Sequence, residues 1–271
     1  GLERLAQFNV KTQMNELVTI KASQASCIQR AGRAGRLQAG FGYRLFSQDD
    51  FKSRDKFSPK AIETEDLAQF TLSLSAWGSI NLDDYFLLNA PHQQRFLDSV
   101  KLLNQLNILS NDENLEDKTL TDHGKSIYQL PLHPRLSHML MAAKHHQNEL
   151  AFTACYIAAI LSEGDPLYFD DSNSDLEARI QLFESNHIPR GFMHGQVKHQ
   201  VAKRIQQLAK RLSQMLSIKV NDLHSNEAGL LLMMAYPDRL AQKRGKGYRL
   251  SQGQGCQLRP GDALTQHDFL A

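Results

Sequence analysis

The sequence predicts a mixed, mainly α-helical protein assembled from several small domains. Apolar residues recur at helical spacing over most of residues 65–217, which indicates long amphipathic helices. Residues 2–20, 40–47 and 245–271 instead carry short apolar runs bounded by glycine or polar residues, which is typical of strands and turns. At 271 residues the chain is long enough for two or more domains, since single domains usually span about 100–200 residues.

The N-terminal part predicts a fragment of an α/β sheet. Residues 2–20 carry apolar runs on either side of a polar centre, which predicts a β-hairpin. Residues 23–38 predict a helix with Ser23 as its N-cap, and residues 40–47 predict the strand that follows this helix. A polar, charged linker is expected over residues 48–64.

The middle of the chain predicts a winged-helix domain over residues 65–130. Two helical stripes are followed by a short hairpin and a third helix, and Trp77 at the end of the first stripe is expected in the core. An all-α bundle is predicted from Pro134 onward, and the tail from Gly245 predicts the first strands of a small β-barrel. The expected bundle helices are residues 134–147, 149–162, 174–186 and 195–217.

Composition and charge indicate a globular protein without a strong overall charge. The formal net charge is +2, so any affinity for nucleic acid must come from local basic patches. Cys27, Cys155 and Cys256 lie far apart, which argues against a disulfide framework or a zinc site and predicts a reducing, cytoplasmic compartment. No apolar run reaches the ~18 residues of a membrane span, so no membrane partner is expected.

The stretch "SCIQRAGRAGRL" at residues 26–37 carries the most specific chemistry. Arg33 and Arg36 project from nearly the same face of the predicted helix, and a guanidinium can hold phosphate oxygens through two hydrogen bonds. Gly32 and Gly35 each cost roughly 1 kcal/mol relative to alanine in a helix, so stability does not explain them. The pattern therefore predicts an anionic ligand that approaches this backbone closely. A solvent-exposed basic helix or a general RNA-binding segment is the alternative.

The full string "QRAGRAGR" resembles motif VI of superfamily 2 helicases, in the spelling of the DEAH/RHA group. The preceding "SQAS" and the later "LPLHPRLSHMLMAA" resemble that group as well. The segment "MMAYPDRLAQKRGKGYRLSQGQG" resembles the bacterial HrpB-type ATP-dependent RNA helicases in particular. The resemblance implies ATP hydrolysis coupled to translocation on RNA or to its unwinding, with single-stranded or partly duplex RNA as the partner.

The resemblance also implies a domain organisation. Residues 1–55 would be the end of a second RecA-like domain, and residues 65–130 the winged helix. Residues 131–228 would be the ratchet bundle, and residues 229–271 the start of an OB-like barrel. The N-terminal hairpin would help to part or clamp the nucleic-acid strand. The linker "SPKAIETEDL" departs from the acidic Pro-Glu-Ile stretch usual in the family, which leaves its docking open.

By resemblance, the contacts to ATP with Mg²⁺ fall on Gln29, Arg33 and Arg36. These positions match residues that contact the γ-phosphate or the attacking water, with the two arginines as arginine fingers, and Arg30 matches a supporting position. The G-x-x-x-x-G-K-[ST] phosphate loop and the DEAH box do not occur in this sequence, and "HGKS" lacks the upstream glycine. We therefore expect a piece of a longer enzyme, which needs the missing RecA-like domains and does not hydrolyse ATP by itself.

A second basic feature lies on the predicted helix 195–217, where an apolar stripe is expected to be core. The stripe is flanked by cations, and no acidic residue occurs over residues 186–221. Either these cations face solvent, or they form part of a channel that tracks phosphates, and the resemblance favours the channel. The nucleic-acid-binding residues predicted here are Lys203, Arg204, Lys210 and Arg211.

Four histidines lie close together in the sequence, at His133, His138, His145 and His146. Because no acid or cysteine stands beside them at ligand spacing, no metal site is expected. The rival interpretation of the chain is a non-enzymatic winged-helix module that binds nucleic acid, in which motif VI has no catalytic role. A phosphate loop and a DEAH box upstream in the gene would decide for the helicase.

Overall fold

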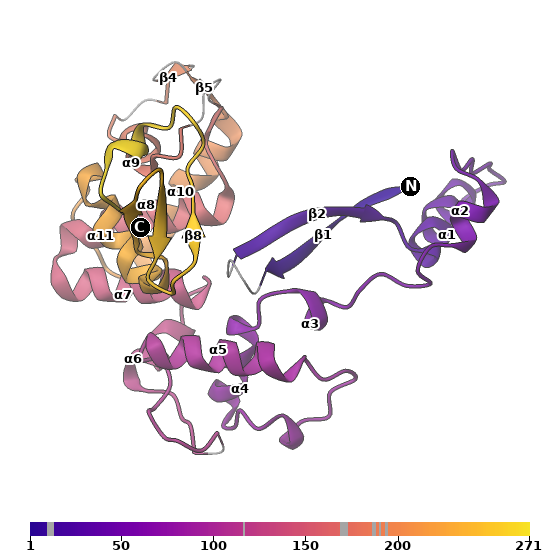
Figure 1. Ribbon diagram of the computed structural model, residues 1–271, viewed down its shortest axis with the longest axis horizontal. Coiled ribbons are helices and arrows are strands. Elements are labelled where there is room, and N and C mark those ends of the chain that lie inside the picture. Colours follow the sequence, from indigo (N-terminus) through magenta and orange to yellow (C-terminus); the bar gives the residue numbers. More distant parts are fainter. Residues whose placement is uncertain (10–13, 116, 169–172, 186–187, 190, 193–194) are drawn as a thin grey trace. The chain divides into compact units, whose positions relative to one another are not determined.

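The structure is a computed structural model (Figure 1), and it describes residues 1–9, 14–115, 117–168, 173–185, 188–189, 191–192 and 195–271. The chain divides into two compact units, one of residues 1–105 with 109–119 and one of residues 106–108 with 120–271. Helices dominate and the sheets are small, which confirms a mixed, mainly α fold.

In the first unit, the predicted N-terminal hairpin is confirmed. Strands β1 (Leu2–Asn9) and β2 (Met14–Lys21) pair antiparallel, from Leu2 opposite Lys21 to Asn9 opposite Met14. The expected polar turn falls outside the described residues. The hairpin is followed directly by Ser23, whose Oγ accepts a hydrogen bond from the Ser26 N–H at 3.1 Å and so caps the next helix, as predicted.

The helix predicted over residues 23–38 is shorter in the structure. Helix α1 spans Gln24–Gly32 and tightens into a 3₁₀ turn, η1, over Arg33–Gly35. The strand predicted over residues 40–47 is wrong, because no described strand pairs with this segment and an isolated strand leaves its backbone groups without partners. Its apolar side chains, which a sheet would bury, are exposed instead; they are Phe41, Tyr43 and Leu45.

The polar linker predicted over residues 48–64 contains two short helices, α2 (Gln48–Lys52) and α3 (Ala61–Thr64). Arg54 between them is buried, and its guanidinium donates to the carbonyl oxygens of Gly1 at 2.6 Å and Ala22 at 3.0 Å. Composition predicted a polar linker, and the structure shows that Arg54 attaches this linker to the base of the hairpin.

Helices α4 (Ala68–Trp77) and α5 (Gln93–Gln105) pack against each other in the first unit, with the 3₁₀ turn η2 (Leu82–Asp84) between them. Trp77 was expected in the core, but its side chain is 70% exposed. Trp77 is the last residue of α4, where the chain turns away through Gly78 at φ 116°, and its ring centroid lies 6.3 Å from that of Tyr85, next to η2.

The second unit is built around α8 (Asn148–Glu163), which is apolar on all sides and contacts both α7 (Pro134–His146) and α10 (His199–Met215). The predicted helical bundle is therefore present, but it is not all-α, and the helix predicted over residues 195–217 begins only at His199. Two shorter helices complete the bundle, α9 (Leu176–Gln181) and α11 (Ala228–Ala235), together with the 3₁₀ turns η3 (Ser225–Glu227) and η4 (Pro237–Arg239), whereas α6 (Asp122–Tyr128) precedes it. A three-stranded sheet joins β3 (Leu167–Tyr168), β5 (Gly195–Val197) and β4 (Gly191–Phe192) in that order.

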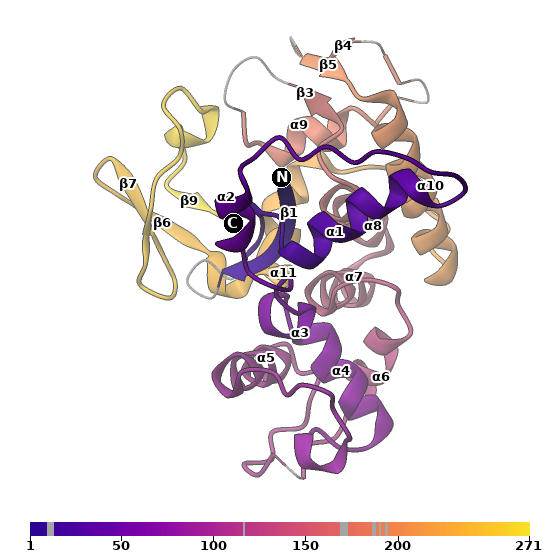
Figure 2. The ribbon, with the colours of Figure 1, turned by 90° about the vertical axis from the view of Figure 1, so that its right-hand side faces the viewer.

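The C-terminal part of the second unit forms a four-stranded antiparallel sheet of order β8-β7-β6-β9. Figure 2 shows β6 (Ala241–Arg244), β7 (Gly247–Leu250) and β9 (Phe269–Leu270) as neighbouring strands, and β8 (Gly255–Cys256) pairs with β7. The 3₁₀ turn η5 (Ala263–Gln266) precedes β9. The described helices include none that is both long and apolar enough to cross a lipid bilayer.

Candidate functional site

The three predicted nucleotide-contacting residues lie at the end of α1 and just after it: Gln29 is in α1, Arg33 begins η1 and Arg36 follows η1. Gln29 and Arg33 are four residues apart, so they lie one above the other on the helix surface. The 3₁₀ turn η1 then brings Arg36 close to the same face, because residues three apart eclipse each other in this geometry. All three side chains are exposed. The structure thus brings the three predicted residues together on one accessible surface.

Neither Arg33 nor Arg36 forms an ion pair through its side chain within the described part of the chain. Arg30 of the same motif, by contrast, contacts Glu3 and Leu2 in β1. An exposed guanidinium without a carboxylate partner keeps its full charge available for an anion. The surface formed by Gln29, Arg33 and Arg36 can therefore accept phosphate oxygens through charge-assisted hydrogen bonds.

The glycines of this region differ in what surrounds them. A Cβ added at Gly32 or Gly35 meets nothing within 4 Å in this chain. At Gly40, however, an added Cβ would lie 1.9 Å from the backbone oxygen of Ala34, and at Gly42 it would lie 3.1 Å from the Cβ of Ala31. The close backbone approach is therefore made by the segment after the motif, which the sequence reasoning missed although "GFG" signals it.

Helix α10 in the second unit buries the predicted apolar stripe, although Met215 at its end is 44% exposed. The four predicted cations are exposed on the opposite side. Arg204 is partly neutralised, because its Nε lies 2.6 Å from Oε2 of Glu163 in α8. The other three form no ion pair with any residue that the structure describes, and these are Lys203, Lys210 and Arg211.

A second cationic surface, which the sequence reasoning missed, lies on the C-terminal sheet. Gln242 stands opposite both Arg249 and Phe269, and residues directly opposite in antiparallel strands share a face. This face is exposed, while the other face buries Tyr248. Beside it lies an open concavity of about 670 Å³ whose lining contains no acidic residue and includes Arg244, Lys246, Arg249, Gly253 and Gly255. The alternation of residues along β6 and β7 is the sequence signal that could have found it.

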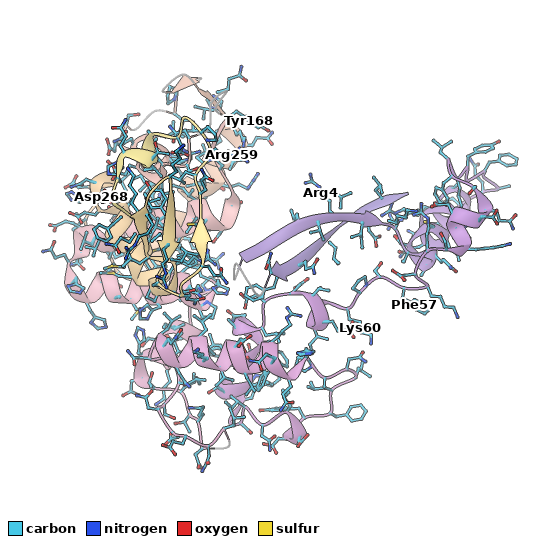
Figure 3. All side chains as sticks on the ribbon, viewed as in Figure 1. Arg4, Phe57, Lys60, Tyr168, Arg259 and Asp268 are labelled. Carbon is cyan, nitrogen blue, oxygen red and sulfur yellow. The ribbon has the colours of Figure 1, made fainter. Side chains whose placement is uncertain are left out.

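At the edge of the small three-stranded sheet, Lys198 lies with its Nζ 3.7 Å from the centre of the Tyr168 ring. Figure 3 labels Tyr168 on this edge of the second unit, where it is 64% exposed. Lys198 also donates to the carbonyl oxygen of Asp165 at 3.1 Å. Its ammonium is thus held by local contacts, unlike the cations along the exposed side of α10.

Of the four histidines that lie close together in the sequence, His138 contacts His123, which lies outside that group. His123 Nε2 lies 2.8 Å from Nδ1 of His138. Burial lowers the pKa of His138 to about 4, aided by the neighbouring His123, and burial also lowers the pKa of His123. Both rings are therefore neutral near pH 7. Across the described residues, no group of three or more His, Cys, Asp or Glu side chains is placed to hold a metal ion.

Residues 133–265 match the family described as Helicase associated domain (HA2), ratchet-like. The chain is 33% identical over 270 residues to the ATP-dependent RNA helicase HrpB of Escherichia coli (strain K12), which covers 99% of this chain and 30% of that protein. The chain belongs to the DEAH/RHA helicase family. Within this family it corresponds to the C-terminal region of the HrpB type.

Two further comparisons agree with this DEAH/RHA assignment. The ATP-dependent RNA helicase HrpA of E. coli is 34% identical over 166 residues, which cover 61% of this chain and 13% of HrpA. The crystal structure of the E. coli DEAH/RHA helicase HrpB superposes with a TM-score of 0.78 at 30% identity, over 100% of this chain and 31% of that one. The chain thus spans about a third or less of the relatives that it matches.

Proposed function

We propose that this chain is the C-terminal portion of an ATP-dependent RNA helicase that couples ATP hydrolysis to translocation on RNA or to its unwinding. The observation that carries the proposal is the exposed surface of Gln29, Arg33 and Arg36 within the sequence QRAGRAGR. Similarity to HrpB over nearly the whole chain supports the same function.

The exposed surface on α1 fits the terminal phosphate of ATP. Its two arginines have no ion pair within the described residues, so an anion meets no competing carboxylate there. Bound ATP with Mg²⁺ supplies the phosphoryl group that is transferred to water. Arg33 and Arg36 stabilise the charge that develops on this group, a contribution worth about 10³–10⁵ in kcat for an arginine finger, and Gln29 orients the water. The metal ligands lie on the missing RecA-like domains.

We propose that the chain contains four domains or parts of domains. Residues 1–55 are the end of the second RecA-like domain. The apolar side chains at residues 40–47 are exposed here, and we expect the rest of that domain's sheet to cover them. Residues 65–130 form the winged helix, whose helices α4 and α5 lie in the first unit and α6 in the second. Residues 131–228 form the ratchet bundle, and residues 229–271 begin an OB-like barrel, which the four-stranded sheet supports.

RNA is the partner that the cations of the second unit recognise. On α10, Lys203, Lys210 and Arg211 offer positive charge to successive phosphates. On the sheet, Arg249 and Phe269 share an exposed face, which suits a phosphate and a stacked base of one strand. A cytoplasmic location stays a prediction, because it rests only on the wide spacing of the three cysteines, which suits a reducing compartment.

The test of the proposed function is the ATPase rate of the full-length enzyme with Arg36→Ala or Arg33→Ala. Each variant should lose nearly all of kcat while RNA binding falls far less, because an arginine finger acts on charge that develops in the transition state. Arg259→Ala, an exposed arginine of the second unit (Figure 3), is the matched control and should keep the wild-type rate. Normal turnover in both finger variants would refute the assignment.

The same measurement distinguishes the rival function. A non-enzymatic nucleic-acid-binding module would bind RNA, but its full-length parent would show no ATPase activity that RNA stimulates. In that case Arg33→Ala and Arg36→Ala would lower RNA affinity alone, by the salt-dependent amount expected for one phosphate contact each.

A further inference from the structure

Arg30, the first arginine of the motif, contacts the hairpin and not the surface formed by Arg33 and Arg36. Its Nη1 donates to the carbonyl oxygen of Leu2 at 3.0 Å, and its Nη2 donates to Oε2 of Glu3 at 3.4 Å. Leu2 and Glu3 both belong to β1. The motif helix therefore presents two sides, one toward solvent and one that holds the hairpin.

Glu3 is the centre of this contact, and its side chain is only 15% exposed. The Oγ of Ser26 in α1 donates to Oε2 at 2.9 Å, and the Oγ of Ser58 donates to Oε1 at 2.8 Å. Burial raises the pKa of Glu3, but the hydrogen bonds from Ser58 and Ser26 and the charge of Arg30 outweigh it and leave the pKa below its ordinary value. Glu3 is thus a carboxylate at neutral pH, and polar groups of α1 and of its surroundings converge on β1.

The base of the hairpin is held a second time by Arg54. In addition to its bonds to Gly1 and Ala22, Arg54 donates through Nη2 to Oδ2 of Asp50 at 2.6 Å, and Asp50 also accepts from Lys21 of β2. Both strands of the hairpin are therefore attached at their base. This attachment fixes where the hairpin starts, whereas the contact between Glu3 and Arg30 fixes its direction relative to α1.

The hairpin itself is a continuous antiparallel ladder over its eight-residue strands. Such a ladder spans about 25 Å and moves as one body, since each residue pair is restrained by its neighbours. A rotation of α1 is accordingly passed along the hairpin as long as Glu3 and Arg30 stay in contact. Without this contact the described residues link β1 to α1 only through a neutral hydrogen-bond acceptor, the Leu2 carbonyl oxygen, and a neutral donor, the Ser26 hydroxyl, so the two elements can turn more independently about the base.

We propose that Glu3 and Arg30 are positioning residues that couple α1, which continues directly into the turn bearing Arg33 and Arg36, to the hairpin. The inference rests on the proposed function, because it takes the two arginines as ligands of the nucleotide and the hairpin as a contact to RNA. Nucleotide binding and release move α1, and the contact between Glu3 and Arg30 imposes that movement on the hairpin. Removal of this interaction uncouples hydrolysis from movement on RNA.

The functional test uses the full-length enzyme with Glu3→Gln, which keeps the shape of the side chain and removes its charge. We expect Glu3→Gln to keep a basal kcat for ATP within about twofold of wild type. We expect the ATP consumed per base pair unwound to rise about tenfold, which is the factor that corresponds to loss of one charged hydrogen bond. Glu63→Gln is the matched control, since Glu63 forms an exposed pair with Lys60 at 3.3 Å (Figure 3 labels Lys60), and it should change neither quantity. Arg30→Gln should raise the ATP consumed per base pair at least as much, because it also removes the hydrogen bond to Leu2, and the double variant should be no worse than Arg30→Gln alone.

A second test uses the present chain and does not depend on ATPase activity. Amide hydrogen exchange in β1 should become about tenfold faster in Glu3→Gln, while exchange in α4 and α5 stays at the wild-type rate. Wild-type coupling in Glu3→Gln, or a fall of kcat and unwinding by the same factor, would overturn the proposal. A wild-type enzyme without RNA-stimulated ATPase would overturn the proposed function, whereas unchanged exchange in β1 would overturn the interaction between Glu3 and Arg30 itself.

Discussion

Arg135 and Asp238, which are 103 residues apart in the sequence, form a buried bidentate ion pair in the second unit. Nη1 of Arg135 lies 2.5 Å from Oδ1 of Asp238, Nη2 lies 2.9 Å from Oδ2, and the side chains are 4% and 7% exposed. Nη1 also donates to the carbonyl oxygen of Ala235 at 3.1 Å. The pair thus joins α7 to the turn η4 that precedes the C-terminal sheet. It explains why "LPLHPRLSH" and "YPDRL" occur together, since each segment supplies one half of the pair.

Asp238→Asn should lower the free energy of unfolding of this chain by about 3–5 kcal/mol, because the change leaves the charge of Arg135 buried without its partner. Urea unfolding followed by circular dichroism measures the loss. Replacing both residues, as Arg135→Met with Asp238→Leu, should recover much of it. Lys125→Ala is the control, because Lys125 pairs with Asp122 at an exposed site and should leave stability unchanged. Equal losses in Asp238→Asn and Lys125→Ala would contradict the role of the buried pair.

The cations of α10 should determine how the binding of RNA depends on salt. Replacing Lys203, Arg204, Lys210 and Arg211 by alanine should weaken binding to single-stranded RNA of any sequence. The slope of log K against log salt should fall by about 0.7 for each phosphate that the variant no longer neutralises. Arg204 contributes least, because Glu163 already pairs with it. Titration of labelled poly-pyrimidine RNA at several salt concentrations measures the slope.

A control for this titration removes the same charge from exposed lysines elsewhere in the chain, namely Lys56, Lys101, Lys144 and Lys219. This control variant should keep most of the parent slope. If the two variants reduce the slope equally, the effect is one of net charge and α10 has no special interaction with RNA.

Gly40→Ala should destabilise the first unit by about 1–3 kcal/mol, since the new methyl group would collide with the backbone oxygen of Ala34 and force the two segments apart. Gly32→Ala should instead stabilise the first unit. Its new Cβ meets open space at the end of a helix, and alanine favours a helix over glycine by roughly 1 kcal/mol. Thermal unfolding of the two variants should show Tm shifts of opposite sign. A neutral Gly40→Ala would mean that the segment does not rest on η1.

The carboxylates of Glu3 and Asp50 should make the first unit sensitive to acid. Hydrogen bonds from Lys21 and Arg54 lower the pKa of Asp50, and those from Ser58 and Ser26 outweigh burial to lower the pKa of Glu3. A lowered pKa in the folded state adds stability above the unfolded pKa of about 4, and this stability is lost as the pH falls through the folded pKa.

The measurement compares the wild type with the variant Glu3→Gln, Asp50→Asn between pH 3 and 7. The difference in Tm should be constant above about pH 5 and should shrink toward zero at lower pH, because the wild-type carboxylates become protonated. A difference that grows as the pH falls would show that the two groups act through something other than their charge.

Local pattern was sufficient for most helices and for the N-terminal hairpin. The helices α7 and α8 were predicted within a residue or two, since periodic apolar residues indicate a helix without knowledge of its neighbours. The helix predicted over residues 174–186 is shorter, the one predicted over residues 195–217 begins only after a strand, and α11 was not predicted. The motif was also predicted from sequence, because its residues are consecutive and its helix places them on one face. The prediction of a strand over residues 40–47 was wrong because a strand forms only when another strand pairs with it, and local sequence does not show whether such a partner is present.

By itself the sequence determined the family, the helices and the residues of the motif, all of which depend on residues near one another in the chain. Only the tertiary structure decided which charged groups pair with each other. Arg30 and Arg33 are each followed by Ala-Gly in the motif, yet Arg30 pairs with Glu3 whereas Arg33 forms no ion pair within the described residues. The same holds for Arg135 and Asp238, and for the cationic face on which Arg249 and Phe269 meet. These pairings are set by which backbone segments the fold brings within hydrogen-bonding distance, and no local periodicity encodes such distances.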